Sequence, residues 1–239
     1  MYEIIKKKLH IIHNIYIKHK FFLSKKSYSM DGEDLIIFDY FKNKKEGFFI
    51  DVGCYHPIHR NNTFLLYKKG WQGINIDIHS FSIDLFNHLR PRDLNYNFAI
   101  SNKNEILKFY YQKELSQLST IEYDQAKKVF QGPIKEKNIQ ALTLNEILKK
   151  SKIEKKIDLL DIDAEGADLK VLQSLSFDKH NPELIKRPSI LLLTKSDLLN
   201  DDVKVKTEKI KISSIIRVSS FTGENLNKSI ELIANLIQD

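Results

Sequence analysis

Four acidic side chains in this sequence lie at the ends of short apolar runs, at spacings that suit ligand binding by an α/β sheet. Asp51 follows the run 48–50, and Asp77 closes the run 74–76. Asp163 and Glu165 follow a third run, 157–162. If the runs are parallel strands, the carboxylates gather at the carboxyl ends of neighbouring strands, where open α/β sheets bind their ligands. Carboxylates there can accept hydrogen bonds from ribose hydroxyls or remove a proton from a reacting group.

A glycine turn follows the first of these acids. Gly53 lets the backbone turn sharply and approach a ligand closely. The next four residues, Cys-Tyr-His-Pro, are too bulky for the glycine-rich cradle that holds a pyrophosphate. We therefore expect an adenosine without phosphates, namely S-adenosylmethionine, held jointly by the strand ends at Asp51 and Asp77.

The elements that must position these groups alternate between strands and helices. Apolar spacing and turn residues predict helices over 30–42, 63–69 and 81–89, and strands over 48–52, 74–77, 95–100 and 157–162. A further strand is predicted over 106–111. Ser119 and Thr143 each stand three residues before a glutamate, which is the spacing of a capping box at a helix start. We also expect the Ser119–Thr120 loop to border the acceptor pocket.

Six ordered motifs make residues 27–185 resemble the FkbM-type methyltransferase family. They are Gly32-Glu33-Asp34, Asp51-Val52-Gly53 with Pro57, Asn62-Thr63, Gly70-Trp71 with Gly73 to Asp77, Arg90-Pro91-Arg92-Asp93, and Ile162 to Gly166. The resemblance implies a Rossmann-like class I methyltransferase fold, an α/β fold whose mostly parallel sheet carries helices on both faces, with S-adenosylmethionine as the methyl donor. A helical extension precedes this core.

The resemblance also suggests roles for individual side chains. Glu33 and Asn62 would join Asp51, Gly53 and Asp77 at the donor site. A second explanation for Glu33 is that acids in a first helical turn are favoured by the helix dipole.

The acids after the third run are the candidates for handling the acceptor. Asp163 and Glu165 could position the acceptor or remove its proton, contact the donor, or hold a divalent metal together with His56. His56 and His59 lie three residues apart, but a third ligand cannot be identified from spacing, so we assign no metal.

The chain divides into three parts by composition. Residues 1–29 form a basic amphipathic extension, 30–185 the methyltransferase domain, and 186–239 a tail of different character. The extension could lie on an anionic membrane surface, or pack on the catalytic domain or a second subunit. Its longest uncharged run, 9–17, is too short to span a bilayer.

The tail resembles the end of an Obg-like GTPase domain. Its Thr-Lys-Ser-Asp run, 194–197, looks like a guanine-recognition motif, and the run 219–226 looks like the base-contacting loop that follows it. The chain lacks the phosphate cradle Gly-x-x-x-x-Gly-Lys-Ser/Thr, so we do not expect GTP hydrolysis. We interpret the tail as a fragment joined to a truncated core, and its two strands could complete the edge of the sheet.

Composition restricts the class of protein further. The net charge is +7, but the lysines are spread along the chain without an aromatic stacking platform, so we expect no nucleic-acid partner. The single cysteine excludes an internal disulfide and fits a cytoplasmic protein, with the membrane surface as a second location.

We predict an S-adenosylmethionine-dependent methyltransferase acting on a hydroxyl of a saccharide or small metabolite. The alternative is a non-catalytic chain that binds a nucleotide or a partner protein. The sequence does not identify the acceptor or the oligomeric state.

Overall fold

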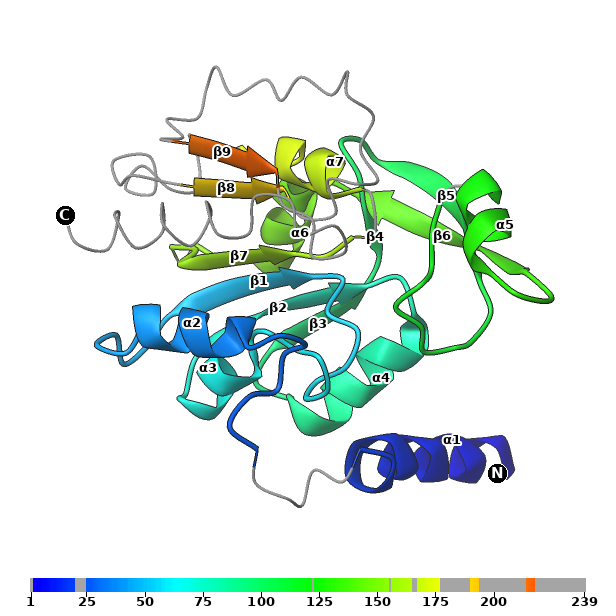
Figure 1. The fold of residues 1–239 in the computed structure, drawn as a ribbon, viewed down its shortest axis with the longest axis horizontal. Helices are drawn as coiled ribbons and strands as arrows, with labels where there is room; N and C mark the ends of the chain where they lie inside the picture. The colour runs from blue at the N-terminus through cyan, green and yellow to red at the C-terminus, as the bar shows by residue number, and fades with distance from the viewer. Residues whose placement is uncertain are drawn as a thin grey trace.

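A four-stranded parallel sheet forms the centre of the protein (Figure 1). The computed structural model describes residues 2–19, 25–121, 123–154, 156–164, 167–176, 190–193 and 214–217. The strands are β1 (Phe48–Val52), β2 (Gln72–Asp77), β3 (Leu94–Asn97) and β7 (Leu159–Ile162), in the order β3-β2-β1-β7. All three pairings are parallel. This arrangement confirms the predicted Rossmann-like α/β fold.

Helices cover both faces of the sheet, because β1 is apolar on both of its sides. Phe48, Ile50 and Val52 face α6 (Leu144–Ser151) and α7 (Asp168–Gln173), whose apolar side chains belong to the same core cluster. Phe49 points to the other face, toward α2 (Glu33–Tyr40) and α3 (Phe64–Lys68). All five residues of β1 are buried, as is typical of a central parallel strand.

The Gly-Trp-x-Gly motif belongs to this packing. Trp71 is fully buried beside Phe49. A Cβ atom on Gly73 would lie 2.2 Å from the ring of Phe49, and one on Gly47 would lie 2.5 Å from the ring of Trp71. The absence of side chains at Gly47 and Gly73 therefore leaves room for the rings of Trp71 and Phe49 between the sheet and the helices that cover it.

A second sheet lies beside the first, and the sequence predicted it incompletely. It contains β4 (Ala99–Ile100), β5 (Glu105–Tyr111) and β6 (Lys135–Leu142), in the order β4-β6-β5, with α5 (Tyr123–Val129) between β5 and β6. The single strand expected over 95–100 is wrong, because the chain leaves the main sheet after β3 and β4 pairs with β6. We did not predict β6, whose residues are mostly exposed and begin with three charged side chains, so that they lack a clear apolar alternation.

The extension before the core packs on α4 (Ser80–Leu89) (Figure 1). It consists of α1 (Tyr2–Ile12), which continues into a π-helical turn, η1 (His13–Ile17). Lys7 forms an ion pair with Asp84 at 2.7 Å, and the ring of His10 stacks on Phe81 at 4.3 Å. In the part of the chain that the structure describes, no helix has the length and apolar character needed to cross a membrane.

Two short strands are described in the tail. They are β8 (Ile190–Leu193) and β9 (Ser214–Arg217), which pair with each other in parallel. They overlap the two strands that the sequence predicts over 189–194 and 215–219. The other residues of 177–239 lie outside the described part, as does the predicted domain boundary at 185–186, and the completion of the sheet edge by the tail stays a prediction.

Candidate active site

A cleft opens at the carboxyl ends of β1, β2 and β7. It contains about 850 Å³ of empty space, a volume that includes open solvent. Its apolar lining includes Val52, Ile76, Ile78, Phe98, Ile100 and Leu107. Its polar lining includes Tyr55, Arg60, Asp77, His79, Gln117 and Asp163. The cleft can therefore take a flat apolar ring that carries polar groups on one side.

The glycine turn after β1 forms the floor of this cleft. Gly53 has φ +83°, and its N–H donates to the carbonyl of Ile76 at 2.9 Å. A Cβ atom at this position would lie 2.0 Å from the carbonyl oxygen of Asp163. The N–H of Asp163 in turn donates to Val52 at 2.9 Å. A side chain would thus separate three strand ends that the backbone holds together.

Asp77 lies at the end of β2 and lines the cleft. Its Oδ2 accepts a hydrogen bond from the N–H of Tyr55 at 2.8 Å, and its Oδ1 accepts one from the N–H of His79 at 2.7 Å. Burial raises the pKa of Asp77 to about 6, and the two backbone hydrogen bonds oppose that rise. Each carboxylate oxygen has a second acceptor site, so Asp77 can still bind a ligand hydroxyl.

Asp51 is near Asp77 but does not belong to the residues that line the cleft. Asp51 pairs with Asn75, two residues before Asp77, so the two carboxylates lie on the same face of the sheet. The Oδ2 of Asp51 accepts hydrogen bonds from Thr63 at 2.8 Å and Asn61 at 3.2 Å. Burial raises the pKa of Asp51 to about 6, against the opposing effect of Arg90. Its role in donor binding stays a prediction.

A second group of acids surrounds Asp161 on β7. Asp161 pairs with Asp51 across the strands, and burial together with Asp51 raises the pKa of Asp161 well above its ordinary value. Asn62 donates to Asp161 at 3.3 Å, and the charge of Glu33 raises the pKa of Asp161 further. Neither Glu33 nor Asn62 lines the cleft, and their donor contacts stay predictions. We missed Asp161 in the sequence, although its position two residues before Asp163 places both carboxylates on one side of the strand.

Of the two candidates for acceptor chemistry, Asp163 and Glu165, the structure describes only Asp163. The exposed Asp163 lines the cleft, whereas Glu165 and Gly166 lie outside the described residues. Within the described ranges, no group of three or more histidine, cysteine or acidic side chains is placed to hold a metal ion.

The segment between β5 and α5 contributes to the lining of the cleft. Ser119 and Thr120 line the cleft, and their contact with an acceptor stays a prediction. Ser119 hydrogen bonds to Nε2 of His79 at 2.5 Å, and α5 begins at Tyr123. Burial lowers the pKa of His79 to about 4, so its ring is neutral near pH 7. Arg60 donates to Gln117 and so connects this segment to the loop that follows Gly53. Composition and spacing did not reveal these contacts.

The family model described as the methyltransferase FkbM domain matches residues 51–228, more than half of the chain. The chain belongs to the FkbM methyltransferase family. Searches of curated proteins and of solved structures found no match. The FkbM match runs through much of the tail, and it gives no support to the GTPase resemblance there.

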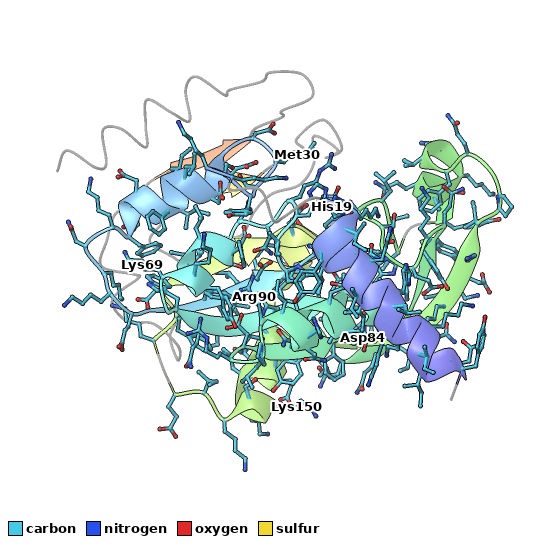
Figure 2. All side chains as sticks on the ribbon, turned by 90° about the horizontal axis from the view of Figure 1, so that it is seen from below. His19, Met30, Lys69, Asp84, Arg90 and Lys150 are labelled. Carbon is cyan, nitrogen blue, oxygen red and sulfur yellow. The ribbon has the colours of Figure 1, made fainter. Side chains whose placement is uncertain are left out.

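Several FkbM motifs meet in one buried network around Arg90, the residue labelled in the middle of Figure 2. Nε of Arg90 contacts Asp93 at 2.9 Å, and both side chains are fully buried. The guanidinium also donates to the side-chain oxygens of Thr63 and Asn61 at 3.1 Å, and these two side chains in turn donate to the carboxylate of Asp51. The Asn-Thr and Arg-Pro-Arg-Asp motifs therefore hold the end of β1 in place through this network.

Proposed function

We propose that this chain transfers the methyl group of S-adenosylmethionine to a hydroxyl of a saccharide or small metabolite. The observation that carries the proposal is the cleft at the ends of β1 and β2, where Asp77 stands beside an apolar wall. Ribose hydroxyls can donate to Asp77, and an adenine ring can pack against Ile78, Phe98 and Ile100. Gly53 leaves room for the backbone to approach the ligand closely.

The charge of the site supports a cationic donor. S-adenosylmethionine supplies an electrophilic methyl group on a positively charged sulfur. Asp77 and Asp163 line the cleft, and Asp51 and Asp161 pair on neighbouring strands outside its lining. Burial raises the pKa of Asp51, Asp77 and Asp161, and a nearby positive charge favours their ionised forms and is itself bound more tightly.

Asp163 is the described side chain best placed to serve the acceptor. It is exposed at the carboxyl end of a central strand and lines the cleft. The acceptor oxygen forms a bond to the methyl carbon while the carbon–sulfur bond breaks, and the hydroxyl proton passes to a base. Asp163 would orient the hydroxyl and accept this proton, and Glu165 is a second candidate for the same role.

Titration calorimetry of the full chain tests donor binding. We expect S-adenosylmethionine to bind, and Asp77→Asn to weaken the affinity by about 10- to 150-fold, because hydrogen bonds to a charged group contribute about 1.5–3 kcal/mol. Asp39→Asn is the matched control, because Asp39 is exposed and contacts only Lys42 among the described ion pairs. Thermal melting of both variants verifies that they fold.

Two results would contradict this assignment. One is equal affinity in the Asp77 and Asp39 variants. The other is binding of GDP in place of S-adenosylmethionine, which would favour the alternative of a non-catalytic chain that binds a nucleotide.

Methyl transfer itself is tested with labelled donor and a panel of saccharide and small-metabolite hydroxyls. Asp163→Asn should lower kcat by about 100-fold or more, as expected for loss of a general base, while donor affinity changes by less than about threefold. An unchanged kcat with an identified acceptor would remove Asp163 from the reaction and leave Glu165 to be examined in the same way.

A further inference from the structure

The helix α1 has two apolar faces, and only one of them is used within the chain. On the inner face, Ile15 of η1, which continues α1, is fully buried against Phe81 and Leu85 of α4. The ion pair of Lys7 with Asp84 fixes the same side of the helix. Both views show α1 beside α4 at the border of the domain (Figure 1, Figure 2). The orientation of α1 on the domain is thus set by these contacts.

The opposite face carries large apolar side chains that are open to solvent. We call it the outer stripe, and it consists of Tyr2 (75% exposed), Ile5 (51%), Leu9 (62%) and Ile12 (43%). The spacing of three and four residues places all four on one side of the helix. Single exposed apolar residues are ordinary, but a continuous stripe of four indicates an interaction surface.

Basic side chains border this stripe. At about 100° per residue, Lys6 and Lys8 lie on opposite sides of the stripe, each about 80° from its centre. Glu3, the acid nearest to them in the sequence, lies about 140° from that centre by the same geometry. All three side chains are exposed, and neither Lys6 nor Lys8 takes part in an ion pair among the residues that the structure describes. The stripe therefore presents an apolar centre between two unneutralised positive charges.

This pattern favours a lipid surface over a second copy of the chain. A second copy would offer lysines to lysines, because no acid borders the stripe. A bilayer offers acyl chains to the apolar side chains and anionic headgroups to the lysines, whose stems can lie along the apolar surface. Tyr2 at one end of the stripe suits the boundary between headgroups and acyl chains. We propose that the outer stripe of α1 docks the protein on the surface of an anionic bilayer.

Vesicle co-sedimentation of the full chain tests the proposal. We expect binding to phosphatidylcholine vesicles that contain about 30% phosphatidylglycerol, weaker binding to phosphatidylcholine alone, and loss of binding when salt rises to about 0.5 M. The double variant Ile5→Ser/Leu9→Ser should bind at least about tenfold more weakly, because the buried apolar area is lost. Ile106→Ser is the matched control, since Ile106 is 68% exposed but lies on β5.

A second pair of variants tests the charges. Lys6→Gln/Lys8→Gln should weaken binding to anionic vesicles, whereas Lys149→Gln/Lys150→Gln, two exposed lysines of α6, should not. The proposal is overturned if the unaltered chain does not sediment with anionic vesicles, or if the Ile5/Leu9 variant binds as the Ile106 variant does. A dimer in solution that the Ile5/Leu9 variant dissociates, without vesicle binding, would assign the stripe to a second copy instead.

Discussion

Replacing Arg90 by methionine tests whether the buried network holds the FkbM motifs together. Arg90 is fully buried, and its guanidinium contacts Asp93, Thr63 and Asn61. The guanidinium carbon, Cζ, is also 5.2 Å from the centre of the ring of Phe49. Methionine has a similar length and keeps the apolar contacts of the stem, but it removes the charge and every donor.

The expected loss of stability follows from the partner that is left behind. Removing one member of a buried ion pair costs about 3–5 kcal/mol, because the other charge remains without compensation. Asp93 still accepts hydrogen bonds from the N–H of Gly73 and from Asn75, each at 3.0 Å, so we expect the lower end of this range. About 3 kcal/mol is a large share of the 5–15 kcal/mol typical of a domain, and it lowers Tm by about 6–12 °C.

Urea unfolding followed by far-UV circular dichroism measures this loss. Arg92→Met is the matched control, because the Arg92 side chain is exposed, donates to the carbonyl of Tyr67 and should contribute about 1 kcal/mol or less. The double variant Arg90→Met/Asp93→Asn should be more stable than Arg90→Met, since it removes the unpaired charge. If Arg90→Met unfolds within about 1 kcal/mol of Arg92→Met, or if Asp93→Asn brings no recovery, then the network is not what stabilises this part of the domain.

Two further predictions concern the turn after β1 and the pH dependence of stability. Gly53→Ala should destabilise the protein more than Gly70→Ala in urea unfolding. Both glycines have a positive φ, but only at Gly53 would the new Cβ meet a backbone oxygen, at 2.0 Å. Equal losses of stability in the two variants would refute the close approach. Burial lowers the pKa of His56 from 6.5 to about 3, so its contribution to stability is present above pH 6.5 and is lost as the pH falls toward 3. Burial raises the pKa of Asp77 from 3.8 to about 6, so its contribution is present below pH 3.8 and is lost as the pH rises through 6. Between about pH 4 and 6.5, the free energy of unfolding should therefore fall less steeply on acidification in His56→Asn than in the unaltered chain, and more steeply in Asp77→Asn. Urea midpoints that change with pH in the opposite directions would contradict both assignments.

The sequence by itself predicted the central sheet and the elements around the turn. Apolar runs that end in Asp51 and Asp77, with Gly53 between them, allow few arrangements other than a parallel βαβ unit. Local periodicity also predicted α3, α4 and β5 to within a residue or two at each end. These features depend on neighbours in the chain, so a linear pattern contains most of the information.

The lining of the cleft was predicted only in part. Gly53, Asp77 and Asp163 line it, and the sequence had placed all three at strand ends. Asp51 and Asn62 were expected beside them, but the structure puts both into hydrogen-bond networks with Thr63 and Asp161, outside the lining. Spacing alone cannot distinguish a side chain that faces a ligand from one that holds its neighbour.

Other features were decided by tertiary structure alone. Arg90 belongs to a motif of the family resemblance, but its burial beside Asp93 and its contacts with Thr63 could not be predicted from that motif. The contact of Ser119 with His79 joins segments forty residues apart, as the pairing of β4 with β6 joins others. The amphipathic pattern of α1 was visible in the sequence, but which apolar face packs on α4 and which stays exposed depends on the partner helix. Such contacts depend on where distant segments meet, and a pattern of nearest neighbours along the chain carries no record of that.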